Sequence, residues 1–321
     1  MKPHSRAQFT KRIAILPVVL LAVSFCAPAS RAARITLPPE AEQALGQIYD
    51  GDPDAAIVAA HAIEQAKPNA PIGYLIEAEA RWWKIYCAAC EIKWGMVDAW
   101  ERKNRLPDDE AYLALAQKVG ELARAQLATS DTAETHVYAG AALALSARLY
   151  ALRGEGRKAA HASVAGRAEF LRALQLDPDE PDATAGLGIY NYFVDSLSGA
   201  VKILRFFMGI PGGSKEEGTR QMKVGIEHGV LLKVDTQFYL ARNLRTFDHK
   251  YEVAASFAEP LAARYPHNPI FLLLAGNVNA ELGRKGKAAG YFHAATAAPA
   301  PDPDCTARVR QLAENFLALA R

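Results

Sequence analysis

The chain has 321 residues, of which 50% are hydrophobic and 22% charged, and this balance excludes a wholly disordered protein. Its formal net charge is +2, but residues 1–29 hold four basic side chains and no acidic one, so the remainder carries −2. Nucleic-acid binding depends on clustered positive charge, which a near-neutral chain does not favour. We therefore expect no nucleic-acid partner.

The first thirty-two residues have the pattern of a secretory signal peptide. Residues 1–12 are polar and basic, and residues 13–27 form an apolar run of about 15 residues, shorter than the ~20 that a membrane-spanning helix needs. Small residues follow, so cleavage after Ala29 or after Ala32 is expected, with a retained membrane anchor as the alternative. The sequence thus predicts a protein exported to the periplasm or cell envelope of a bacterium, with no transmembrane span in the mature chain.

The rest of the chain has the periodicity of helices. Tyr74, Ala78 and Trp82 are spaced four residues apart, and apolar side chains three or four apart recur along the whole length. Alternating strand patterns and two-residue hairpin turns are nearly absent. The sequence predicts an all-α fold.

Pairs of prolines divide this helical sequence into units. They stand at 68 and 71, 178 and 181, 266 and 269, and 301 and 303. In each pair one proline ends a helix and the next suits the first turn of another. Pro266 and Pro301 are 35 residues apart, close to the period of a repeat made of two helices.

The last of these intervals carries a family pattern. Its small and large positions are Gly276 in the first helix, Gly283 in the turn, and Ala288, Phe292 and Ala295 in the second helix. Residues 269–301 therefore resemble a tetratricopeptide repeat (TPR), although Leu272 and Asn279 stand where aromatic residues are common. Residues 39–68 show the same pattern more weakly.

The resemblance implies a TPR-like solenoid of helical hairpins. We expect five or six hairpins over residues 33–301 and a C-terminal capping helix over 302–321, with Leu312, Phe316 and Leu319 facing the stack. The chain also resembles uncharacterised exported bacterial TPR proteins.

An insertion of about twenty residues, near 198–215, interrupts the central repeat. Its segment 201–208 is apolar nearly all round, so we expect a buried extra helix or else a contact with a partner or a membrane surface. The following glycine-rich loop is not a phosphate-binding loop, because Glu216 follows Lys215 where serine or threonine is required. Ser214 and Glu217 predict a capping box that opens the next helix.

The cysteines allow several interpretations. Cys87 and Cys90 have CxxC spacing, but Glu91 stands where covalent haem attachment requires histidine, and no second ligand pair completes a zinc site. With Cys305, three cysteines remain after signal removal, an odd number in an oxidising compartment. Packed residues, a disulfide between Cys87 and Cys90, and a thiol redox or metal-binding role all remain open.

Other chemistry has little support in the sequence. The histidines are scattered singly, and neither an HExxH nor a GxSxG motif occurs, so we expect no enzyme, no cofactor and no metal. A tryptophan-rich second hairpin, with Trp82, Trp83, Trp94 and Trp100, could bind a glycan or small molecule, although helical spacing favours packing between helices.

The expected function is a non-catalytic protein-interaction scaffold. TPR-like solenoids bind protein or peptide partners on a concave face lined by the first helix of each hairpin. Asn191, Arg242, Asn243 and Asn277 are the polar residues expected to face such a partner, because amides pair with peptide backbone and guanidinium with carboxylate. A redox or metal-binding protein using Cys87 and Cys90, and a glycan binder, are the alternatives.

Overall fold

The computed structural model describes residues 35–89, 108–197, 202, 209–300 and 302–320. Over these residues every regular element is a helix, which confirms the all-α prediction. Within the same ranges, no helix combines the length and apolar character that crossing a membrane would require. The predicted signal peptide lies outside them, as does segment 201–208 except for Lys202.

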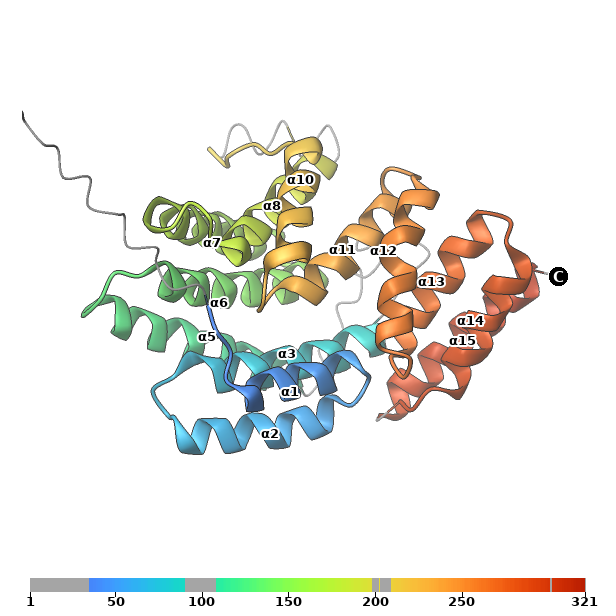
Figure 1. Ribbon diagram of the computed structural model, residues 1–321, viewed down its shortest axis with the longest axis horizontal. Coiled ribbons are helices and arrows are strands. Elements are labelled where there is room, and N and C mark those ends of the chain that lie inside the picture. Colours follow the sequence, from blue (N-terminus) through green and yellow to red (C-terminus); the bar gives the residue numbers. More distant parts are fainter. Residues whose placement is uncertain (1–34, 90–107, 198–201, 203–208, 301, 321) are drawn as a thin grey trace, which may run out of the picture. The chain divides into compact units, whose positions relative to one another are not determined.

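The helices follow one another in antiparallel pairs (Figure 1). Their bounds are α1 (Pro39–Tyr49), α2 (Pro53–Ala66), α3 (Pro71–Ala89), α5 (Asp108–Leu127), α6 (Ala133–Leu152), α7 (Gly156–Leu176), α8 (Pro181–Ser196), α10 (Lys215–His228), α11 (Lys233–Thr246), α12 (Tyr251–Arg264), α13 (Pro269–Glu281), α14 (Lys285–Ala297) and α15 (Pro303–Ala320). The described part of the chain thus forms six pairs, α1/α2, α3/α5, α6/α7, α8/α10, α11/α12 and α13/α14, followed by α15.

The helix starts follow from local chemistry. Pro71, Pro181, Pro269 and Pro303 each open a helix, where the missing N–H costs nothing. Ser214 caps α10, since Glu217 donates its backbone N–H to Ser214 Oγ at 3.3 Å. The expected capping box is only half formed, because the Glu217 carboxylate accepts from Arg220 at 2.6 Å.

Glycines let paired helices approach closely. A Cβ on Gly276 of α13 would lie 2.5 Å from the ring of Phe292 on α14. The ring of Phe170 on α7 likewise occupies the positions where a Cβ on Gly140 of α6 or on Gly186 of α8 would lie. A glycine on one helix facing a phenylalanine on another is therefore a recurrent packing unit in this chain.

The first helices of successive pairs also contact one another. α1 lies against α3, α3 against α6, α6 against α8, α8 against α11, α11 against α13, and α13 against α15. α15 in turn contacts α3, so the last helix of the row packs against a helix near its start. The apolar face of α15 includes buried Leu312 and Phe316, while the Leu319 side chain lies outside the described part.

Aromatic side chains fill the space where the row returns. Trp83 of α3 lies edge-on to Phe238 of α11 at 5.2 Å and to Phe271 of α13 at 5.3 Å between ring centroids. Tyr49 of α1 contacts Tyr265, the residue after α12, at 5.9 Å. The N-terminal pair thus shares one hydrophobic core with helices nearly two hundred residues later.

Polar contacts and a disulfide reinforce this closure. Asp50 accepts from the backbone N–H of His267 at 3.2 Å, and Asn268 Nδ2 donates to the carbonyl of Tyr49 at 2.9 Å. Cys87 is bonded to Cys305, with Cα atoms 5.0 Å apart, although the two residues are 218 positions apart in sequence. The disulfide considered between Cys87 and Cys90 is therefore not the one that forms, because the fold brings α15 against α3. Cys90 lies outside the described residues.

Candidate functional site

The structure buries most of the polar residues expected to face a partner. Arg242 exposes 2% of its surface and Asn277 4%, and Asn243, whose Oδ1 accepts from Arg242 at 3.4 Å, is buried as well. Asn191 is partly buried, and its Nδ2 donates to Gln221 Oε1 on α10 at 2.9 Å. The four side chains therefore do not form an exposed row.

The physical reason is the closure of the helix row. The sequence pattern placed these residues on first helices, one turn from the packing positions, and an open solenoid would leave that side to solvent. Here Tyr49 of α1 and Trp83 of α3 contact side chains of α11 and α13, so the side of those helices expected to form a groove is filled by these two residues and their neighbours.

Four first helices and the second helix α5 contribute polar side chains to a central polar cluster, namely Tyr49 of α1, Glu79 of α3, Tyr112 of α5, Arg148 of α6 and Asp235 of α11. Both guanidinium NH groups of Arg148 donate to the Glu79 carboxylate, and its Nε donates to Tyr112 Oη at 2.7 Å. Tyr49 Oη donates to Asp235 Oδ2 at 3.2 Å. Hydrogen bonds thus join α3, α5 and α6 in one group and α1 and α11 in another, and the carboxyl groups of Glu79 and Asp235 interact between the two groups.

The charges in the central polar cluster balance only if one acid is protonated. Burial and the neighbouring Glu79 carboxylate raise the pKa of Asp235 well above its usual range. Its Oδ1 has no donor among the described residues, which fits a proton held between the two carboxyl groups. Arg148 and Glu79 then neutralise each other, and burial raises the pKa of nearby Tyr239 to about 12.

The arrangement favours a structural role over a chemical one. The guanidinium of Arg148 lies 4.4 Å from the ring centroid of Trp82 and is held by two hydrogen-bond partners, so it is fixed in place. Ionised groups held this way cost several kcal/mol to desolvate, and a buried pair is retained where geometry and extra hydrogen bonds compensate. The central polar cluster therefore fixes which helices meet.

Sequence reasoning missed this cluster. A signal was present, because Glu79 and Arg148 are charged residues with apolar neighbours on largely buried helices, and a charge at such a position requires a partner. The identity of the partner was out of reach, because Arg148 follows Glu79 by 69 residues and Asp235 follows Tyr49 by 186.

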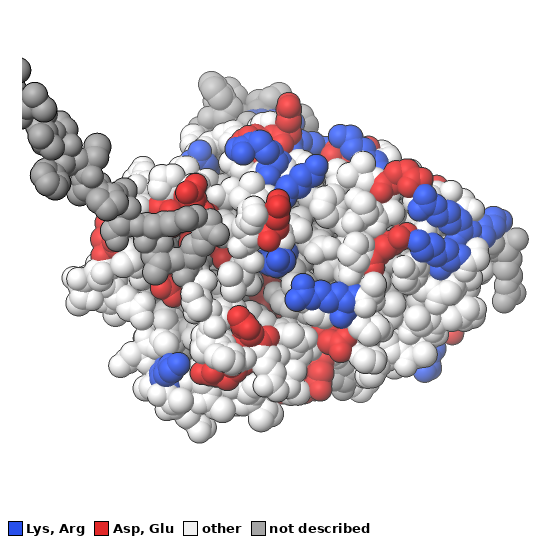
Figure 2. Space-filling view, viewed as in Figure 1, with Lys and Arg blue, Asp and Glu red and all other residues white. Residues whose placement is uncertain are grey.

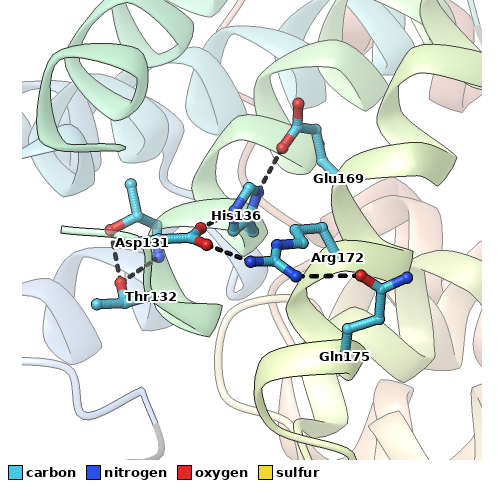
Figure 3. Close-up of polar contacts among 7 residues, drawn as sticks. Asp131, Thr132, His136, Glu169, Arg172 and Gln175 are labelled. Atoms are coloured by element: carbon cyan, nitrogen blue, oxygen red, sulfur yellow. Dashed lines mark hydrogen bonds and ion pairs between the residues drawn. The ribbon is translucent and has the colours of Figure 1, made fainter. Parts of the chain in front are cut away.

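A second polar group joins α6 to α7 (Figure 3). His136 lies between two acids, with Nε2 at 2.6 Å from Asp131 and Nδ1 at 2.6 Å from Glu169. Arg172 pairs with the other oxygen of Asp131, and with His136 it lowers the pKa of that carboxyl. Because both ring nitrogens are engaged, neither is left to exchange a proton with a substrate, and the group acts as a clamp between the helices.

The residues behind the two alternative functions are also packed inside. Trp82 and Trp83 are buried, so they present no open ring face to a sugar, and Trp94 and Trp100 lie outside the described residues. Cys87 is buried and bonded to Cys305, which leaves it no thiol for exchange in this state.

One further group differs from these closed contacts. His61, Glu64 and Glu77 bring three ligand atoms to within 4.8 Å of one another, and within the described ranges this is the group whose donors are arranged to hold a metal ion. Comparison with known proteins gives no guide to function, because no protein-family model and no curated protein matches the sequence.

Proposed function

We propose that the chain is a TPR-like, non-catalytic interaction scaffold that works in the bacterial periplasm or cell envelope and binds a protein or peptide partner. The observation that carries the proposal is the succession of helix pairs in which each first helix contacts the next. The glycine–phenylalanine contacts that recur between helices support a repeat architecture, and repeats of this kind serve as extended binding surfaces.

The partner surface in this proposal lies on the second helices, α2, α5, α7, α10, α12 and α14. The first helices are occupied by contacts with one another, and Arg242 and Asn277 are buried there. The second helices keep one side in solvent, with exposed residues such as Gln117, Arg157 and Lys223. On the face shown in Figure 2, basic and acidic side chains are interspersed, which fits a protein partner better than a polyanion.

The disulfide supports export. Cys87 and Cys305 are paired, and such bonds form and persist in the periplasm and outside the cell but are rare in the cytosol. This agrees with the signal peptide that the first thirty-two residues predict.

Photo-crosslinking in the native host tests the proposal. A photoreactive amino acid is placed at one exposed position on each second helix, including Val58 of α2, which is 71% exposed, and Val253 of α12. The proposal expects a reproducible protein adduct from one helix, which is lost when exposed neighbours on that helix are changed to glutamate.

A matched position on a first helix sharpens the result. The same photoreactive residue in place of Asn191 of α8 should give no adduct, because that side chain faces α10. An adduct from Asn191 alone would favour the concave face instead. Recovery of the folded chain without any adduct from all six second helices would contradict the scaffold.

A further inference from the structure

His61, Glu64 and Glu77 converge between α2 and α3. His61 and Glu64 stand three residues apart on one side of α2, and Glu77 reaches them from α3. His61 Nε2 lies 3.2 Å from Glu77 Oε2, and one atom of each of the three residues falls within a 4.8 Å group. The three donors therefore come from two adjoining helices to one point.

The close approach of the two helices is built into the sequence. A Cβ on Gly73 would lie 2.7 Å from Glu64 Cγ and 3.3 Å from the carbonyl oxygen of Ala60. Gly73 stands one helical turn before Glu77, so the glycine lets α3 come near enough for Glu77 to reach the side chains of α2.

Glu77 is held in place by a chain of ion pairs. Its side chain is only 7% exposed, and Oε1 accepts from Arg81 Nε at 2.8 Å. Arg81 is fixed in turn by Asp108 at 2.7 Å. This leaves Oε2 directed at His61, and outer-shell hydrogen bonds of this kind are what orient the carboxylate ligands of metals.

One acceptor at this point lacks a donor. Glu64 Oε1 is buried and has no hydrogen-bond partner among the described residues, while its neighbour Glu77 is another carboxyl group. Two carboxylates that face each other require a proton or a cation between them.

We propose that His61, Glu64 and Glu77 form a zinc-binding site. A tetrahedral zinc ion with bonds of 2.0–2.2 Å places its ligand atoms about 3.4 Å apart, close to the separation of His61 Nε2 and Glu77 Oε2. A histidine nitrogen with two carboxylates suits zinc, whereas calcium and magnesium prefer oxygen ligands alone.

The site has an entrance and an unfilled coordination position. His61 is 50% exposed, so an ion reaches the site from solvent, and three protein ligands leave the fourth position of a tetrahedral ion for water. Zinc binding at this site needs no partner, so it can be tested apart from the scaffold function.

Titration calorimetry of the untagged full chain, stripped with chelator, tests the site with zinc chloride as the probe. We expect one tight zinc per chain and a melting temperature that rises with zinc, because binding to the folded state stabilises it by mass action. His61→Ala and Glu64→Gln should each weaken binding by more than the roughly 10–100-fold that loss of an outer-shell partner costs.

His228→Ala is the matched control, since His228 is 51% exposed beside Glu227. This variant should keep the tight zinc site. Circular dichroism without metal establishes that every variant folds. Zinc binding no tighter in the wild type than in the double variant His61→Ala/Glu64→Gln would overturn the proposal. So would magnesium binding equal to that of zinc.

Discussion

Asp235 holds a proton that an exposed aspartate would release. Its carboxyl group is buried beside Glu79 and accepts a hydrogen bond from Tyr49. Ionising it would place a second negative charge against one guanidinium, that of Arg148, so the neutral form is favoured. The proton makes the central polar cluster electrically balanced.

This predicts a pH dependence of stability. A carboxyl group whose pKa is raised in the folded state stabilises the protein fully below its ordinary pKa, about 3.9 for aspartate, and that contribution is lost as pH rises through the raised pKa. Asp235→Asn removes the ionisation, so its free energy of unfolding should fall less with rising pH than that of the wild type. Urea denaturation from pH 5 to pH 9 measures both slopes, and parallel slopes would contradict the shared proton.

Arg148 should be the residue of the central polar cluster least tolerant of change. Arg148→Met leaves Glu79 and Asp235 without a cation, and breaking a buried pair costs about 3–5 kcal/mol. Arg220→Met removes the exposed pair with Glu217, which solvent screens, so the free energy of unfolding should change little. Equal losses from the two variants in urea denaturation would show that the buried guanidinium is not needed.

The close packing of paired helices in this chain depends on which positions are glycine. Gly276 has the Phe292 ring where its Cβ would be, whereas Gly290, on the partner helix, has no atom within 4 Å of its Cβ position. Both positions are helical, so the intrinsic preference for alanine, about 1 kcal/mol, is the same at each. Only the packing differs.

Paired alanine substitutions separate these two contributions. Gly276→Ala forces α13 and α14 apart and should lower the free energy of unfolding by about 1–3 kcal/mol. Gly290→Ala should leave it unchanged or raise it by about 1 kcal/mol. Thermal and urea denaturation of both variants provide the comparison, and a stabilising Gly276→Ala would refute the close contact.

The elements were predictable because their signals are local. Prolines at 71, 181, 269 and 303 open helices, Ser214 caps α10, and Gly283 adopts the positive φ of a turn. The packing of Gly276 on Phe292 also follows the repeat spacing. Each of these depends on residues in the same helix or in the next one.

The meeting of distant helices was not predictable. Nothing near Tyr49 in the sequence indicates Asp235, and CxxC spacing directed attention to Cys90 when the partner of Cys87 was Cys305. The zinc site escaped although its residues lie on consecutive helices, since Glu77 joins His61 and Glu64 only after α3 has packed on α2. Whole-molecule closure also explains why Arg242 and Asn277 are buried.

The closure itself is testable through its covalent link. Cys305→Ser removes the covalent link between α15 and α3, which joins residues 218 positions apart, and loss of a disulfide typically costs about 2–4 kcal/mol. Hydrogen exchange should quicken first in α15, because the remaining contacts of this helix with α3, α13 and α14 must hold it unaided.

Cys87→Ser should give the same loss of stability as Cys305→Ser, and the double variant should lose no more than either single variant. Peptide mapping without reductant should recover the peptides of Cys87 and Cys305 joined. If Cys305→Ser left both stability and exchange unchanged, the noncovalent contacts of Tyr49, Trp83 and Asp50 would be sufficient to close the row of helices.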